Sequence, residues 1–376
     1  MKILIAPDKF RGSLEADEVC AAIETGIKMA YPDAVVKAIP LADGGEGTMQ
    51  ILTGLANGNK ETAIVQDPLG RKIEAEYGIA ADGQTAFIEM AAASGLKLLD
   101  KHEYNPAATS TFGTGQLILK VVERGVENVI LGIGGSATND AGIGMAAALG
   151  YRFFDQNDQL LSPIGGNLQH IARIDASQVL SELKEVRFTI ACDVTNPLYG
   201  REGAAYVYGP QKGADATLVE TLDQGLKHFS KIATKTFGKD ISQTPGAGAA
   251  GGLGAGCIYF LNATLQNGVG IVMEQAGIEN IIADSDLVIT GEGKVDEQTL
   301  SGKVVKGLAD RCSKYKVPLA VVCGTLLISP EQTRSAGITY AVSVLNKPMD
   351  LDEALLSASK LVKEATFNMV RLFFQK

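Results

Sequence analysis

Hydrophobic residues recur along the chain in short continuous runs that alternate with segments of helical periodicity. The run KILIA at residues 2–6 predicts a strand, and apolar positions spaced by three and four residues over 14–30 predict a helix. Ser13 is a plausible N-cap, because acidic residues follow it in the first turn. The same alternation predicts a strand over 35–39 and a helix over 46–56.

The same alternation returns near the C-terminus. Three nearly continuous apolar runs predict strands over 286–290, 318–323 and 338–344. Helices are predicted over 303–315 and 351–372. Strands of this kind are typical of a parallel sheet that is buried on both faces.

The middle of the chain has a different pattern. From about residue 62, TAIVQDPLG, RKIEAEYGIA and TAFIEMA predict a strand, a Pro-Gly turn and a hairpin, which is an antiparallel signature. Strands are predicted beyond it over 128–133, 150–155 and 187–192, and helices over 114–124, 139–149 and 217–235. A Gly/Ala-rich loop over 245–256 is predicted to run into a buried helix. We therefore expect an α/β fold in which residues 1–65 and 283–376 form one domain and residues 66–282 an inserted α/β domain.

Composition and charge narrow the class of protein. The 376 residues carry a net charge of −9, which argues against a nucleic-acid binder. No apolar stretch is long enough for a membrane span, and the short apolar run at the N-terminus does not fit a signal peptide. The five cysteines are far apart and have no metal-binding spacing, so reduced thiols in a cytoplasmic protein are expected.

Four polar, glycine-rich segments follow predicted strands, where ligands bind in parallel α/β sheets. They are residues 6–14, 40–48, 129–150 and 290–303. In the first, Asp8, Lys9 and Arg11 suit a metal and an anion, although an ordinary turn with solvated charges has the same composition. In the second, Asp43 and Glu46 flank two glycines, and the alternative is a tight turn with a helix cap.

The segment 290–303 combines acids and a lysine beside a helix start. Glu292, Asp296 and Lys303 in this arrangement resemble a Mg²⁺–phosphate site. The sequence contains no G-x-x-x-x-G-K-[ST] motif, which excludes P-loop chemistry.

The segment 129–150 contains a partial dinucleotide fingerprint. Gly132, Gly134 and Ala137 fit the pattern, and Asp155 lies about 20 residues further on, which points to a nicotinamide enzyme. Against this, Asp140 at the helix start would repel a pyrophosphate unless a metal intervened. The alternative to a dinucleotide site is that these glycines only allow the helix and strand to pack closely.

The neighbouring sequence suggests two further candidate site residues, Asp193 and Lys212. Asp193 comes directly after a predicted strand and precedes Asn196-Pro197, so we expect it at a sheet edge. Lys212 lies in YGPQKGA, where it would be accessible to an anion. Surface turns are the alternative for both. None of the three histidines has a triad partner nearby in the sequence.

Seven motifs in order resemble the type-1 glycerate kinase family, over residues 1 to about 370. They are PDKFRGSL, LADGGEGT, GIGGSATNDAGIGMA, CDVTNPLYG, GPQKGA, GAAGGLGA and TGEGKVDEQT. The resemblance implies ATP-dependent phosphorylation of D-glycerate with Mg²⁺. It also implies a flavodoxin-like (Rossmann-like) parallel-sheet domain and an inserted domain, with the active site in the cleft between them. Ala141 stands where the family commonly has glycine, and Arg11 is favoured over Lys9 as the functional cation.

The motifs and the resemblance together assign roles to the candidate residues. The predicted catalytic residues are Asp193, Asp296, Asp8 and Lys303. Asp193 and Asp296 are also the predicted metal residues, one as Mg²⁺ ligand and the other as the group that orients or deprotonates the hydroxyl. Glycerate is expected to contact Arg11, Asp43, Glu46 and Arg71. ATP is expected to contact Gly134, Gly135, Ser136, Asn139, Asp140 and Lys212.

The sequence leaves two other functions open. An NAD-dependent oxidoreductase and a non-catalytic binding protein for a small sugar acid are the alternatives. The resemblance favours 2-phosphoglycerate over 3-phosphoglycerate as the product. The oligomeric state, monomer or homodimer, is also left open.

Overall fold

The structure is a computed structural model that describes residues 1–42, 44–300 and 303–374. The chain divides into two compact units, Met1–Asp43 with Val269–Lys376, and Gly44–Gly268. As predicted, both chain ends contribute to one parallel sheet, and a separate mixed sheet lies between them in the sequence. Helix α2 (Thr48–Leu55) belongs to the second unit because it packs against that unit's strands.

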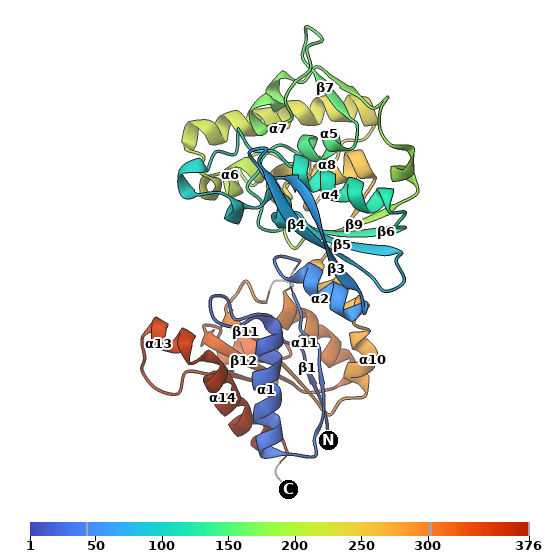
Figure 1. Cartoon of the computed structure of the whole chain (residues 1–376). Coiled ribbons are helices and arrows are strands. Elements are labelled where there is room, and N and C mark those ends of the chain that lie inside the picture. Colours follow the sequence, from blue (N-terminus) through green and yellow to red (C-terminus); the bar gives the residue numbers. More distant parts are fainter. Residues whose placement is uncertain (43, 301–302, 375–376) are drawn as a thin grey trace. The chain divides into compact units, whose positions relative to one another are not determined.

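The sheet of the first unit has five parallel strands in the order β13-β12-β11-β1-β2 (Figure 1). The strands are β1 (Lys2–Ile5), β2 (Val35–Ala38), β11 (Leu287–Val295), β12 (Leu319–Leu326) and β13 (Tyr340–Ser343). In register, Ile5 of β1 lies opposite Ile289 of β11 and Ala38 of β2. The strands predicted from the apolar runs are therefore confirmed, although β11 and β12 extend several residues beyond their predicted ends.

Helices α1 (Ala16–Ala30) and α14 (Ala358–Phe373) pack side by side on one face of this sheet (Figure 1). Alternate strand residues such as Ile3 and Ile5 join their core, as the period of two in a strand requires. The two helices approach closely at Gly26, where a Cβ would lie only 2.5 Å from the Lys363 carbonyl oxygen. Helix α11 (Val304–Tyr315) also packs against β11 and β12 and against α10 (Ile278–Ala283).

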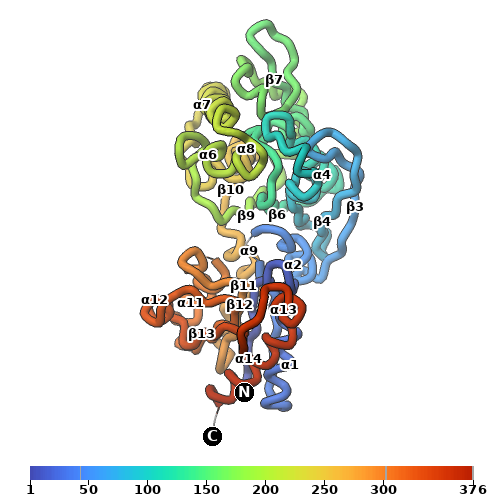
Figure 2. Tube along the Cα trace, turned by 90° about the vertical axis from the view of Figure 1, so that its left-hand side faces the viewer, coloured from blue at the N-terminus to red at the C-terminus, as the bar shows by residue number. Residues whose placement is uncertain are grey.

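Two details of the helices in this unit differ from the prediction. Glu15, not Ser13, is the N-cap of α1, where Glu15 and Glu18 form a reciprocal capping box. The Ser13 hydroxyl instead donates to the Phe10 carbonyl. The predicted C-terminal helix is broken at Ser357 into α13 (Leu351–Leu356) and α14, which follow one another in the trace of Figure 2.

The second unit contains a six-stranded mixed sheet in the order β10-β9-β6-β5-β4-β3. Strands β3, β4 and β5 pair antiparallel, which confirms the predicted hairpin, and β5, β6, β9 and β10 pair parallel. The strands are β3 (Asn59–Gln66), β4 (Lys72–Ile79), β5 (Thr85–Glu89), β6 (Asn128–Gly132), β9 (Arg187–Ala191) and β10 (Thr264–Gln266). A separate two-stranded sheet joins β7 (Arg152–Phe154) and β8 (Arg173–Asp175).

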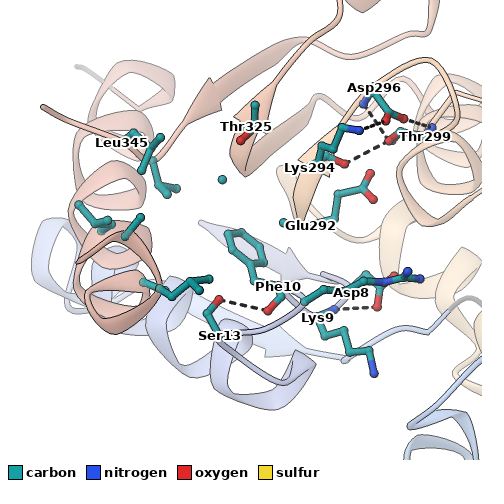
Figure 3. Close-up of a pocket in the computed structure, with 18 of the residues that line it drawn as sticks. Asp8, Lys9, Phe10, Ser13, Glu292, Lys294, Asp296, Thr299, Thr325 and Leu345 are labelled. Atoms are coloured by element: carbon teal, nitrogen blue, oxygen red, sulfur yellow. Dashed lines mark hydrogen bonds and ion pairs between the residues drawn. The ribbon is translucent and has the colours of Figure 1, made fainter. Parts of the chain in front are cut away.

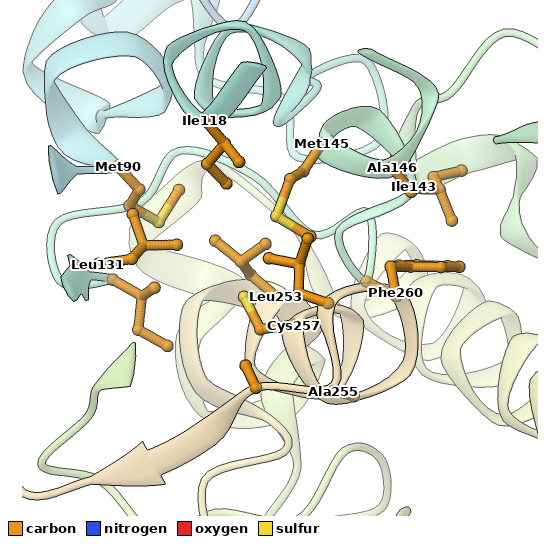
Figure 4. Close-up of a cluster of buried hydrophobic side chains, with 14 of the residues drawn as sticks. Met90, Ile118, Leu131, Ile143, Met145, Ala146, Leu253, Ala255, Cys257 and Phe260 are labelled. Carbon is orange, nitrogen blue, oxygen red and sulfur yellow. The ribbon is translucent and has the colours of Figure 1, made fainter. Parts of the chain in front are cut away.

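The main core of the second unit lies between this sheet and several helices (Figure 4). Leu131 from β6, Ile118 from α4, Met145 from α5 and Leu253 from α8 meet there. The helices concerned are α4 (Phe112–Glu123), α5 (Ile143–Ala148), α7 (Ala216–Phe237) and α8 (Ala249–Leu261). All five cysteines of the chain are free thiols, and none of the helices in the described ranges is both long and apolar enough to cross a membrane.

Helix α5 begins at Ile143, four residues later than predicted. Ala141 and Gly142 have φ angles of +51° and +74°, so the chain turns through left-handed backbone before the helix starts. An alanine in this region is strained, since its Cβ crowds the following carbonyl. A glycine at position 141 would relieve this strain.

Candidate functional site

A pocket of about 460 Å³ opens at the carboxyl ends of the strands in the first unit (Figure 3). The chain runs from β1 to β2 in one direction along the sheet and from β11 to β13 in the other, so strand order reverses between β1 and β11. Ligands of open parallel sheets bind at such a reversal point. Here the Asp8 backbone N–H donates to the Gly291 carbonyl at 2.9 Å, which places Asp8 beside Glu292.

The pocket has a charged end and an apolar wall. The charged end contains three carboxylates and four cations, which are Asp8, Glu292, Asp296, Lys9, Arg11, Lys294 and Lys303. The apolar wall comes from Phe10, the residues after β13, and helices α13 and α14, and consists of Phe10, Val344, Leu345, Leu351, Ala354, Leu355, Ala358 and Leu361. The structure therefore brings together four predicted residues, Asp8, Arg11, Asp296 and Lys303. Predicted residue Asp43 lies outside the described residues.

Glu292 is the central carboxylate of the charged end. It lies half-buried on β11, and Figure 3 shows its side chain between Asp8 and the loop of Asp296 and Thr299. Its Oε1 atom is buried and has no hydrogen-bond partner among the described residues. Burial, together with the nearby Asp8 charge, raises the pKa of Glu292 to about 7. The sequence analysis noted Glu292 in its segment but did not select it, because strand periodicity does not show which carboxylate is left without donors.

Asp296 is held by its own loop. Its Oδ1 accepts hydrogen bonds from the backbone N–H of Gln298 at 2.9 Å and of Thr299 at 3.3 Å. The Lys294 ammonium lies 2.8 Å from Oδ2 and is the main cause of a lowered pKa at Asp296. Asp296 therefore stays ionised and shapes the loop at the pocket edge.

The glycine-rich segment of the second unit is organised around Asp140. This carboxylate is fully buried, and burial raises its pKa. It accepts hydrogen bonds from the Thr111 N–H and hydroxyl and from the N–H groups of Gly142 and Gly144. A pyrophosphate at the start of α5 would need the N–H groups of Gly142 and Gly144 as donors. The side chain of Asp140 already accepts hydrogen bonds from both, so it occupies the place of such an anion. The partial dinucleotide fingerprint therefore lacks an open anion site there.

Lys212 is not accessible as predicted, because only 1% of it is exposed. Its ammonium donates to the Ser136 Oγ and to the Thr138 carbonyl, both at 2.7 Å. Burial lowers the pKa of Lys212 to about 7. Asn139, the residue after Thr138, is also buried. Neither the nitrogen nor the oxygen of its side-chain amide has a hydrogen-bond partner in the described part of the chain. Gly134 and Gly135 precede this cluster, and Gly135 has left-handed backbone with φ of +76°.

Two predicted glycerate-binding residues, Glu46 and Arg71, also lie in the second unit. Glu46 forms an ion pair with Lys97 at 2.6 Å. Arg71 pairs with Asp67 at 2.5 Å and with Glu103 at 2.7 Å. Asp67 lies only four residues before Arg71, so the sequence could have suggested this ion pair, but it does not indicate the pair with Glu103.

Asp193 follows strand β9, as predicted. Its Oδ1 accepts a hydrogen bond from the Gly268 N–H at 2.9 Å, at the first residue of α9 (Gly268–Gln275). Over residues 1–42, 44–300 and 303–374, no group of three or more His, Cys, Asp or Glu side chains is placed to hold a metal ion. Mg²⁺ in phosphoryl-transfer sites often takes only one or two carboxylates, because phosphate oxygens and water complete its shell.

Comparison with known proteins agrees with these features. The model of the glycerate kinase family matches residues 3–374. A glycerate kinase of Halalkalibacterium halodurans is 46% identical over 98% of this chain and 97% of its own. A glycerate 2-kinase of Escherichia coli K12 is 44% identical over 98% and 97%. A solved structure described as glycerate kinase 2, from Salmonella typhimurium LT2, superposes with a TM-score of 0.89 at 41% identity and covers 99% of this chain and 98% of its own. The chain is an enzyme that belongs to the glycerate kinase family.

Proposed function

We propose that this protein transfers the γ-phosphoryl group of ATP to the 2-hydroxyl of D-glycerate, with Mg²⁺ as cofactor, and releases 2-phosphoglycerate. The observation that carries the proposal is the charged end of the pocket, at the strand-order reversal of the first unit. The name of the Escherichia coli relative, glycerate 2-kinase, supports the 2-position. A small-molecule acid and a nucleotide are the partners that this site chemistry suits.

The cations of the charged end suit a polyanionic transition state. Phosphoryl transfer depends on positioning and on charge stabilisation more than on covalent chemistry. Lys303 opens helix α11 beside the pocket and would contact a phosphate, where the helix N-terminus also favours an anion. The planar guanidinium of Arg11 matches the glycerate carboxylate.

The donor set of the pocket also fits Mg²⁺, which prefers hard oxygen ligands. Asp8 and Asp296 are the carboxylates that would hold the ion, and Mg²⁺ when bound neutralises phosphate charge. The predicted role of Asp193 as a metal or base residue stays a prediction. The predicted role of Asp43 at glycerate also stays a prediction.

Glu292 is our candidate for the general base. A base must be able to accept a proton near the working pH, and its free oxygen must reach the hydroxyl. The buried Oε1 atom of Glu292, without a partner in the described ranges, and a pKa of about 7 meet the first requirement. Asp296 suits this role less, because Lys294 and two backbone N–H groups already stabilise its charge.

Phosphorus NMR of the product tests the proposed reaction. The protein is incubated with D-glycerate, ATP and Mg²⁺, and a second sample contains excess EDTA. Phosphorylation at C2 couples phosphorus to one proton and gives a doublet, whereas phosphorylation at C3 couples it to two and gives a triplet. We expect the doublet with Mg²⁺ and no product with EDTA. A triplet would overturn the 2-position, and full activity in EDTA would overturn the role of Mg²⁺.

A further inference from the structure

We propose that the apolar wall of the first unit's pocket binds the nucleobase of ATP, with the triphosphate reaching the charged end. This proposal rests on the proposed kinase activity, because it assigns the place of the phosphoryl donor. It locates the base in the first unit, whereas the sequence motifs pointed to the glycine-rich segment of the second.

The first support is the division of the pocket by polarity. One end carries carboxylates and cations, and the other is mainly apolar, with side chains such as Leu345, Leu351 and Leu355 beside the hydroxyls of Ser13 and Thr325. A ligand that fills both ends needs an anionic part for the cations and a large part of low polarity for the wall. A nucleoside triphosphate has this form. Glycerate does not, since each of its three carbons bears oxygen and it has no surface to bury against leucines.

The second support is the exposure of the wall itself. Leu351 is 72% exposed and Leu345 is 43% exposed, and both border a cavity of about 460 Å³. This volume lies within the range of pockets that bind nucleotide-sized ligands. A ring that packs on these side chains would remove their apolar surface from water, which favours binding.

The third support is that the glycine-rich segment of the second unit, the alternative ATP site, already has its donors occupied. In the second unit the Asp140 carboxylate already accepts hydrogen bonds from Gly142 and Gly144, and Lys212 is buried. Helix α5, which follows, has only six residues. The first unit instead offers its pocket at the strand-order reversal, which is where nucleotides bind in open parallel sheets.

Helix α13 provides a matched pair of variants. Leu351 and Leu356 are both exposed leucines of this short helix, but only Leu351 lines the pocket. Leu351→Gln removes part of the wall, and Leu356→Gln is the control with the same chemical change. Ala354→Phe is a third variant, which fills the pocket from the same helix.

The measurement is calorimetric binding of two probes to the full chain, a non-hydrolysable ATP analogue and inorganic tripolyphosphate. The Kd of the ATP analogue should rise about fivefold in Leu351→Gln and more in Ala354→Phe, since each loses apolar burial. It should be unchanged in Leu356→Gln. Tripolyphosphate, which has no base, should bind all four proteins equally.

Kinetics separate this proposal from the proposed function. In an active wild type, KM for ATP should rise in Leu351→Gln while KM for glycerate stays the same. Unchanged affinity of both wall variants for the ATP analogue would overturn the assignment even if glycerate is phosphorylated. If the wild type does not phosphorylate glycerate but the wall variants still weaken the analogue, the proposed function fails and the nucleobase site stands. A rise in KM for glycerate alone would place the acid at the wall and contradict the proposal.

Discussion

Asp140 accepts two hydrogen bonds from one residue, Thr111, whose backbone N–H and hydroxyl each lie 2.8 Å from Oδ2. The Thr111 hydroxyl in turn accepts a hydrogen bond from the Met145 N–H of α5. A buried carboxylate therefore joins the start of α4 to α5. This relationship makes Asp140 a residue of the fold, although its sequence context suggested contact with a cofactor.

Asp140→Asn should lower the stability of the protein rather than its affinity for ATP. An amide in place of the carboxylate turns one acceptor oxygen into a donor that faces other donors. We expect a loss of about 2 kcal/mol or more in the free energy of unfolding, measured by urea titration. Asp82→Asn, at an exposed turn residue, should change stability by less than about 0.5 kcal/mol. Normal stability with a raised KM for ATP would instead support a cofactor role.

Ala141→Gly should stabilise the protein. Relief of left-handed backbone strain at φ of +51° contributes about 1–2 kcal/mol, and loss of one buried methyl costs about 0.8 kcal/mol. We expect a net gain of about 0.2–1.2 kcal/mol in the free energy of unfolding, measured by thermal or urea unfolding. Ala146→Gly is the matched control, because Ala146 is equally buried but lies within helix α5, where glycine should destabilise. Equal effects of the two changes would contradict the role assigned to strain.

Lys212 should make stability depend on pH above neutrality. Its pKa is lowered from 10.5 to about 7 by burial, so between these values the unfolded chain binds a proton that the folded chain does not. Stability should therefore rise as pH rises from 7 towards 10, by up to about 1.4 kcal/mol per unit. Lys212→Met should remove this rise in urea titrations from pH 7 to 9. Nearby Asp140 is unchanged in the variant, and an unaltered slope would show that another group is responsible.

Arg71→Gln tests whether this arginine contacts glycerate. In the structure its guanidinium pairs with Asp67 and Glu103, and half of its side chain is exposed. We expect KM for glycerate to change by less than twofold and the free energy of unfolding to change little, because solvent screens exposed ion pairs. A tenfold rise in KM at normal stability would return Arg71 to the substrate site.

Periodicity predicted most elements of the fold. The short apolar runs of β1, β11 and β12 and the alternating pattern of β3 and β4 are typical of strands. Element ends depend on competing contacts instead. Glu15 displaced Ser13 as the cap of α1 because Glu18 completes a capping box. Helix α5 starts late because Ala141 and Gly142 have left-handed backbone.

The charged end of the candidate pocket could be predicted where charged residues follow a strand of the parallel sheet. Asp8, Arg11, Asp296 and Lys303 all line one pocket, since parallel strands end at the same edge. The apolar wall could not be predicted, because α13 and α14 look like ordinary amphipathic helices in the sequence. Likewise, no pattern shows that Lys212 is buried or that Glu292 has an oxygen without a donor.

The most direct test of the account is the turnover of Glu292→Gln with D-glycerate, ATP and Mg²⁺. The variant removes a half-buried carboxylate whose charged form is disfavoured by burial, so its melting temperature should equal or exceed that of the wild type. We predict that kcat falls by about 10²-fold or more, as expected for loss of a general base. Glu297→Gln, an exposed neighbour on the same loop, is the control that should keep its activity. A Glu292→Gln protein that folds normally and retains wild-type kcat would contradict the assignment of phosphoryl transfer to this pocket.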